Sequence, residues 1–143
     1  MRLNFKKSYL LIFLVLVGCS DGTGTVEVKW DRDSCERCRM VISDRHFAVQ
    51  VRGGPRNKIY LFDDIGCAVH WLNDQEWGKG SKIWVADYRS GQWLDAYTAH
   101  YVVGQITPMN FGLGAIAKPV KGSMDFATAK TQLLLNKHQH ISQ

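Results

Sequence analysis

The chain has 143 residues, with 18 Lys and Arg against 13 Asp and Glu, and its formal net charge is +5. Three of the basic residues, Arg2, Lys6 and Lys7, belong to an N-terminal segment that we expect to be removed, which leaves a net charge of +2. Because no basic stripe is interleaved with aromatic residues, the charge gives no argument for nucleic-acid binding. The remaining length suits one compact domain, or two small halves that share a core.

The N-terminus has the two parts of a secretory signal, a basic start followed by an apolar stretch from Tyr9 to Val17. The stretch is too short for a permanent transmembrane helix. It ends in Leu16-Val17-Gly18-Cys19, the pattern of a lipobox, in which cleavage leaves the cysteine as an acylated N-terminus. We therefore predict a signal peptide over residues 1–18 and a membrane anchor on Cys19. The alternative is a plain signal peptide that happens to end near a cysteine.

Ser20, rather than an aspartate, follows the cysteine. By the usual sorting pattern this predicts the periplasmic side of the outer membrane of a Gram-negative cell. We expect the lipid anchor and a flexible tether over residues 19–29, because residues 21–25 are polar and glycine-rich. The domain is predicted over residues 30–137, and a frayed polar tail over residues 138–143.

Along the chain, strands are predicted over residues 47–51 and 59–62, with a turn at 53–57 between them. A helix follows, capped by Asp63 or Asp64 and ending at about residue 73 or 75. The apolar residues of this helix recur at the spacing of an amphipathic helix and so form one apolar face. A further strand is predicted over residues 82–86. That face consists of Phe62, Ile65, Val69 and Leu72.

The second half has short predicted strands over residues 92–95, 100–103 and 115–118, with a glycine-rich loop at 110–114. Ser123 is the predicted cap of a helix that runs to about Asn136. Each half therefore consists of strands followed by a helix. We predict an α+β fold with two small related ββαβ-like halves that share a compact core.

Three cysteines remain once Cys19 is assigned to the lipid, namely Cys35, Cys38 and Cys67. An odd number of cysteines in an oxidising compartment cannot all pair within one molecule. Two explanations are open at this point. One is a single disulfide with a spare thiol, and the other is a metal site built from thiolates.

The segment from residue 33 to 40 contains three sulfur-bearing side chains, Cys35, Cys38 and Met40. If Cys38 to Met40 is extended, these two side chains point the same way, because side chains alternate along a strand. A thiolate with a thioether is a soft ligand pair that favours Cu(I), whereas zinc rarely takes methionine. Arg37 and Arg39 should favour the thiolate form of the cysteine between them.

Three other interpretations compete with a copper site. Met40 precedes two apolar residues and could simply pack in the core. Cys35 and Cys38 could form a disulfide or the redox pair of a thiol-disulfide oxidoreductase, although the usual thioredoxin-like setting is missing. Cys67 and His70 have the spacing Cys-x-x-His on one side of the predicted helix, away from its apolar face. With Cys35 and Cys38 they would complete the zinc site of a zinc-stabilised interaction lipoprotein.

Met109 lies between a proline and a glycine in a predicted loop, where a methionine has less reason to be a core residue. It is therefore a second candidate thioether ligand. We interpret His100 as a polar strand residue, and His138 and His140 as solvated residues of the tail. We predict no catalysis, because no Ser-His-Asp or paired-carboxylate arrangement is present and Asp63-Asp64 fits a helix start.

Several of these features together resemble the NosL family of copper lipoproteins over essentially the whole mature chain. They are the lipobox, Cys38-x-Met40, the hairpin and helix around Phe62-Asp63-Asp64, Trp93-Leu94-Asp95-Ala96 and Pro108-Met109. The resemblance implies a Cu(I)-binding metallochaperone that supplies copper for assembly of the copper centres of periplasmic nitrous-oxide reductase. It also implies the fold of two related halves.

By matching position, the resemblance implies Cys38 and Met40 as copper ligands and Met109 as a more distant one, with Cys35 as a further candidate. The chain departs from the family pattern at Asn110, where a glycine is expected after Pro-Met. It also has additional thiols at Cys35 and Cys67. These departures leave the number of ligands open.

Overall fold

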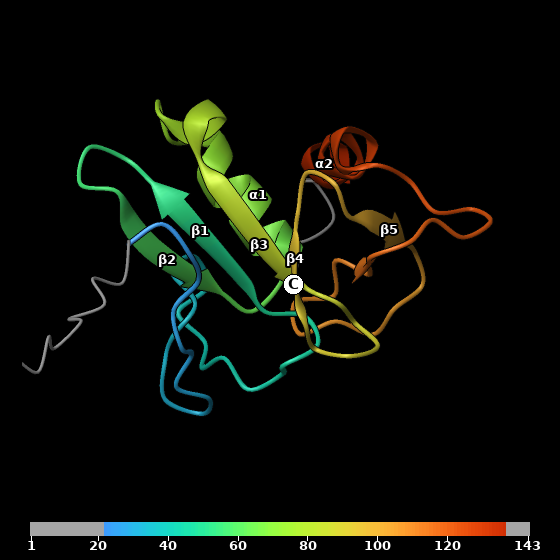
Figure 1. Cartoon of the computed structure of the whole chain (residues 1–143). Coiled ribbons are helices and arrows are strands. Elements are labelled where there is room, and N and C mark those ends of the chain that lie inside the picture. The colour runs from blue at the N-terminus through green and yellow to red at the C-terminus, as the bar shows by residue number, and fades with distance from the viewer. Residues whose placement is uncertain (1–21, 137–143) are drawn as a thin grey trace, which may run out of the picture.

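The computed structural model describes residues 22–136, and the first 21 residues with Cys19, like the tail from residue 137, lie outside this part. The described chain contains both helices and antiparallel strands (Figure 1), so the predicted α+β class is confirmed. The elements are β1 (Val49–Gly53), β2 (Lys58–Phe62), α1 (Ile65–Asn73), the 3₁₀ turn η1 (Gly78–Gly80), β3 (Lys82–Ala86), β4 (Trp93–Asp95), β5 (His100–Val102), β6 (Gly114–Ile116) and α2 (Phe126–Leu135).

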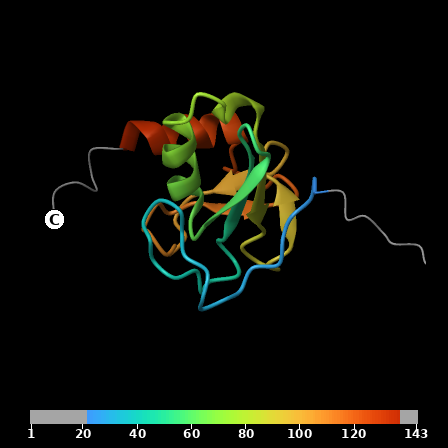
Figure 2. The ribbon, with the colours of Figure 1, turned by 90° about the vertical axis from the view of Figure 1, so that its left-hand side faces the viewer.

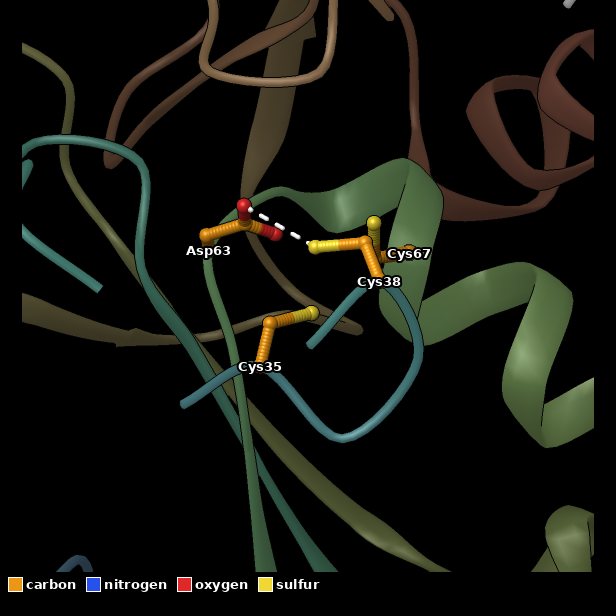
Figure 3. Close-up of side chains that lie close together, drawn as sticks. All are labelled: Cys35, Cys38, Asp63 and Cys67. Carbon is orange, nitrogen blue, oxygen red and sulfur yellow. Dashed lines mark hydrogen bonds between the residues drawn. The ribbon is translucent and has the colours of Figure 1, made fainter. Parts of the chain in front are cut away.

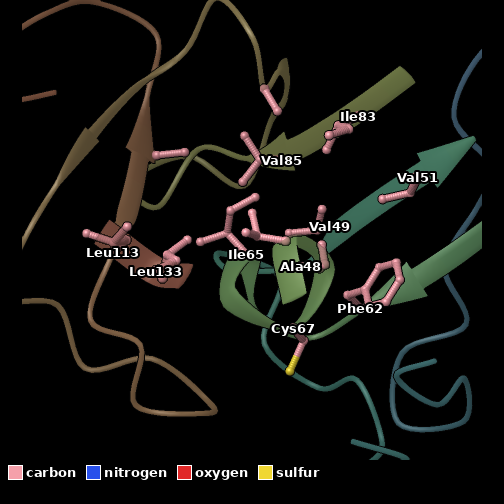
Figure 4. Packing of buried hydrophobic residues seen from close by; sticks show 14 of the residues in the cluster. Ala48, Val49, Val51, Phe62, Ile65, Cys67, Ile83, Val85, Leu113 and Leu133 are labelled. Carbon is pink, nitrogen blue, oxygen red and sulfur yellow. The ribbon is translucent and has the colours of Figure 1, made fainter. Parts of the chain in front are cut away.

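The main sheet has four antiparallel strands in the order β2-β1-β3-β4, and α1 packs against one of its faces. Alternation of apolar residues explains the buried face, because Val49 and Val51 point the same way and lie opposite Val85 and Ile83 in register. The core lies between this face and the two helices (Figure 4). The first half, β1-β2-α1-β3, thus has the predicted ββαβ order.

The second half is arranged differently from the first. Its strand β4 joins the first sheet, while β5 and β6 form a separate two-stranded ribbon against which α2 packs (Figure 2). Asp125 caps α2 by accepting a hydrogen bond from the Thr128 N–H at 2.8 Å. The predicted cap, Ser123, instead closes the preceding turn through the carbonyl of Val120.

Helix α1 is buried on almost every side, from Ile65 to His70 and again at Leu72. Cys67 and His70, which the sequence places away from the apolar face of the helix, are therefore buried as well. Besides the sheet, the loop of residues 107–112 covers this helix at Gly66 and His70. The ring of Phe111 lies so close to Gly66 that an added Cβ would be 2.1 Å from it.

The N-terminal segment from residue 22 to 28 lies against the sheet. The fully buried Gln50 side chain accepts from the Val26 N–H at 2.8 Å and donates to the Val26 carbonyl at 2.9 Å. Arg52 donates to the Gly24 carbonyl at 2.8 Å. The described part of the expected tether is thus held in place. No helix among residues 22–136 is long and apolar enough to cross a membrane.

Candidate metal centre

Four side chains converge at the start of α1, Cys35, Cys38, Asp63 and Cys67 (Figure 3). Their sulfur atoms and one carboxylate oxygen all lie within 4.8 Å of one another. Two cysteines come from the loop before β1, Asp63 follows the last residue of β2, and Cys67 lies in the first turn of α1. Cys35 and Cys67 are fully buried, whereas Cys38 is half-buried, so Cys38 gives the cluster its access to solvent.

A tight turn of the backbone positions the first two sulfur atoms. The Cys35 N–H donates to the Met40 carbonyl at 2.8 Å, and the Arg39 N–H donates to the Cys35 carbonyl at 3.0 Å. The Cys35 sulfur accepts backbone hydrogen bonds from Cys38 and Asp63, and the Cys38 sulfur accepts one from Met40. The turn therefore holds both sulfur atoms by backbone donors before any metal is bound.

Arg39 has a φ of 65°, in the left-handed region, so Cys38 to Met40 is not extended as predicted. The alternation of side chains fails there, and the Met40 side chain is 55% exposed. Met40 contributes its backbone carbonyl and N–H to the turn.

The three thiols differ in acidity. The pKa of Cys35 is lowered to about 6, chiefly because the Cys67 thiol donates to its sulfur and backbone N–H groups add to this. The pKa of Cys67 is raised, because its thiol donates a hydrogen bond to the Cys35 sulfur and because the group is buried. Burial raises the pKa of Cys38 to about 12. One thiolate and two thiols therefore share the cluster at neutral pH.

The prediction that the two flanking arginines favour the Cys38 thiolate was wrong. Both Arg37 and Arg39 are exposed, and Arg39 lies 3.9 Å from the carboxylate of Glu36. Solvent weakens the effect of exposed charges, while burial of Cys38 and the nearby Cys35 thiolate disfavour a second negative charge.

Asp63 completes the cluster. Its Oδ2 accepts a hydrogen bond from the Cys38 thiol at 3.3 Å, whereas its buried Oδ1 has no hydrogen-bond partner among the described residues. A buried carboxylate oxygen without a partner is costly and rare. A cation bound beside the three sulfur atoms would satisfy this oxygen.

The neighbouring Asp64 is fully buried and joins two segments. Its Oδ1 caps α1 at the Gly66 N–H, and its Oδ2 accepts from the Met109 N–H, both at 3.2 Å. The Thr107 hydroxyl also bonds to this carboxylate, whose pKa is raised mainly by burial. Asp64 thus fastens the loop of residues 107–112 to the helix that carries Cys67.

The structure brings together two of the four predicted ligands, Cys35 and Cys38. Cys67, which belonged to the zinc alternative, joins them, whereas His70 is outside the cluster found in the described chain and its ring lies 5.6 Å from that of Phe111. Met109 is half-buried against the core, in the loop that Asp64 fastens. A coordinating role for Met40 and Met109 stays a prediction.

Two sequence signals have clear structural explanations. Asn110 has a φ of 61°, so it adopts the left-handed conformation for which glycine is favoured, and asparagine is among the residues that tolerate it. Asp63 was missed as a donor because the pair Asp63-Asp64 was interpreted as a helix start. Only Asp64 caps the helix, which leaves its neighbour for the cluster.

In comparisons with known proteins, no protein-family model matches the chain and no curated protein matches it. Among solved structures, it is similar to the copper chaperone NosL from Shewanella denitrificans, with a TM-score of 0.56 and 17% sequence identity. The match covers 78% of this chain and 87% of that one. The chain therefore has a NosL-like fold, with a cluster of three cysteines and one aspartate that could hold a metal ion.

Proposed function

We propose that this protein is a lipid-anchored Cu(I) metallochaperone of the periplasmic side of the cell envelope, which delivers copper to nitrous-oxide reductase or its assembly machinery. The observation that carries the proposal is the cluster of three cysteine sulfurs, of which only Cys38 reaches solvent. Soft sulfur ligands favour Cu(I) among the common metals. The copper ion is cargo in this proposal, and the protein performs no catalysis.

Uptake and release follow from the unequal burial of the three thiols. Cys35 and Cys67 would hold Cu(I) from the buried side, and Cys38 would close the site from the solvent side. A ligand side chain of a partner protein can approach next to Cys38 and bind the metal before the two buried sulfurs dissociate from it. A site closed on all sides would instead retain the metal as part of the fold.

A structural zinc site is the second candidate, and Asp63 is the observation that favours it. Three thiolates and one carboxylate are a complete tetrahedral set for Zn²⁺. This set replaces His70 of the sequence-based zinc hypothesis by Asp63. The proposal for copper rests on the majority of soft donors, and on the name of the solved structure that shares the fold, a copper chaperone.

A thiol-disulfide oxidoreductase fits the geometry less well. Such enzymes attack with an exposed cysteine in its thiolate form. Here the acidic thiol, Cys35, is fully buried, while the half-buried Cys38 has a pKa raised to about 12. The exposed sulfur is therefore the less nucleophilic one.

Delivery to nitrous-oxide reductase is proposed from the resemblance described above, together with the NosL-like fold. The anchor and the compartment are proposed from the lipobox at Cys19, which lies outside the described residues.

The test is an anaerobic titration of the reduced protein with Cu(I) against a chromophoric competitor, with and without Zn(II). We expect one Cu(I) per chain that zinc does not displace. The matched variants are Cys67→Ala, which removes a clustered donor, and Met40→Ile, which removes the exposed thioether. If zinc displaces copper and Cys67→Ala abolishes the fold, the zinc proposal replaces the copper proposal.

Delivery needs a separate experiment. The Cu(I)-loaded protein is mixed with copper-free nitrous-oxide reductase in the presence of excess thiol chelator, and the enzyme's copper absorption is followed. We expect the copper centres to form from the loaded protein, and not from the same copper held by the chelator alone. Equal formation in both samples would contradict a delivery role.

A further inference from the structure

Five basic side chains gather at the end of the sheet remote from the metal centre. In the pairing of β1 with β3, Arg52 lies opposite Lys82. In the pairing of β1 with β2, Lys58 lies opposite Gly53, the next residue along β1. Arg56 lies in the turn between β1 and β2, and Lys79 lies in η1 just before β3. The metal centre lies beyond the other end of β2, about 16 Å along a strand of five residues.

These cations are not neutralised by carboxylates. Within residues 22–136 the structure has one ion pair, that of Arg39 with Glu36, which lies in the cysteine loop. Two acidic side chains border the basic end, since Glu76 lines a cavity with Lys79 and Asp95 lines another with Lys82. Five cations against two bordering carboxylates leave a positive surface there.

A cleft of about 320 Å³ opens within this surface, lined among others by Thr23, Arg52, Asn57, Trp77 and Lys82. The Trp77 ring packs directly against the backbone of Gly53 beside this cleft, because a Cβ on Gly53 would lie 2.5 Å from the ring. The carbonyls of Gly24 and Asn57 hold the Arg52 guanidinium through three of its hydrogen bonds. The remaining guanidinium N–H groups and the Lys82 ammonium are the donors that a phosphate group requires.

The N-terminal segment enters the domain at the same place. Asn57 donates to the Gly22 carbonyl, and Thr23 lines the cleft itself. Cys19 precedes Gly22 by three residues, which reach at most about 11 Å. An acylated Cys19 would therefore bring this end of the sheet to the membrane surface. Trp77 and Tyr60, stacked at 5.8 Å, are side chains of the type that settles at such interfaces.

The cysteine loop lies on the other side of the molecule. Figure 2 places the first described residues (blue) and the loop before β1 (cyan) at opposite sides of the domain. Contact of the basic end with a membrane would thus leave the loop that carries the half-buried Cys38 on the aqueous side, where a partner can reach it.

We propose that the cleft between Arg52, Trp77 and Lys82 binds the phosphate of an anionic phospholipid headgroup, so that the basic end of the sheet rests on the membrane and the metal centre faces away from it. This inference rests on the anchoring part of the proposed function and is independent of the metal. The headgroup contact would fix the orientation of the domain, which a lipid anchor alone does not do.

The test uses a chain that starts at Gly22, so that no acyl chain contributes to binding. Both helices, both sheets and the hydrophobic core described above lie within residues 22–136, so this chain keeps all of them. Binding to vesicles is measured by co-sedimentation, with phosphatidylcholine alone and with added phosphatidylglycerol. The variant Arg56→Gln/Lys58→Gln/Lys82→Gln removes three charges of the basic end. The control Arg89→Gln/Lys118→Gln/Lys121→Gln removes three exposed charges elsewhere.

We expect binding only to vesicles that contain phosphatidylglycerol, and a loss on the order of 100-fold in the basic-end variant. The control variant should keep most of its binding, and high salt should release the protein. The proposal would be overturned by equal binding to both kinds of vesicle or by an equal loss of binding in both variants. It would also be overturned if the protein bound polyglutamate, a polyanion without phosphate, but did not bind the vesicles. Cu(I) titration of the same variants separates the two proposals, because removal of these charges should leave copper affinity unchanged.

Discussion

The number of protons released on Cu(I) binding follows directly from the protonation of the three thiols. Metal ions bind thiolates, so every thiol proton in the free cluster must leave. Cys35 has a pKa of about 6 and is ionised at pH 7.5, whereas Cys38, with a pKa raised to about 12, and Cys67, with a raised pKa, keep their protons. Binding by all three sulfurs therefore releases two protons.

The affinity should rise with pH, since a higher pH removes the protons that compete with the metal. Two protons correspond to a hundredfold gain in affinity per pH unit, or about 2.7 kcal/mol. This slope holds between about pH 6 and the pKa values of the two thiols. Below about pH 6 the Cys35 thiolate also takes up a proton, and the slope should steepen to three.

The assay is a Cu(I) competition titration at several pH values between 6.5 and 8.5, combined with direct measurement of proton release in weakly buffered solution. Met40→Ile should show the same slope, because a thioether binds no proton in this range. A slope of one would refute the reasoning. It would indicate that only one of the two protonated thiols, Cys38 or Cys67, binds copper.

Three further substitutions and one control, Gly80→Ala, test the local structure by urea unfolding. Arg39→Gly should raise the free energy of unfolding by up to about 1 kcal/mol, because it relieves a left-handed φ of 65°, and a loss would contradict this strain. Gly66→Ala should lower it by about 1–3 kcal/mol, because Phe111 must move, whereas Gly80→Ala, in open space, should change it by less than about 0.5 kcal/mol. Asp64→Asn should cost about 1–3 kcal/mol by leaving a buried N–H without its acceptor, and an unchanged stability would refute the fastening role.

Much of the fold could be predicted from local patterns. Alternating apolar residues located β1, the turn after it indicated β2, and β3 has the predicted bounds, Lys82–Ala86. The helix after Phe62 begins at the predicted cap, Asp64. These elements follow from side-chain period and capping, which act over a few residues.

The site was only half predicted, because its members meet through tertiary contacts. Cys35 and Cys38 are close in sequence, and their spacing indicated a metal or redox role. The approach of Cys67 and Asp63 to this pair, and the left-handed backbone at Arg39 beside Met40, are features that no periodic pattern reveals. Burial of Cys67 likewise depends on tertiary contact, because its thiol lies with Cys35 and Cys38 of a loop about 30 residues earlier in the chain.

The most direct test of the central claim is X-ray absorption of the Cu(I)-loaded protein, which counts the sulfur atoms bound to copper. We predict three sulfur ligands in the natural protein and in Met40→Ile, and two in Cys67→Ala. A sulfur count that falls in Met40→Ile and stays the same in Cys67→Ala would contradict the three-cysteine site.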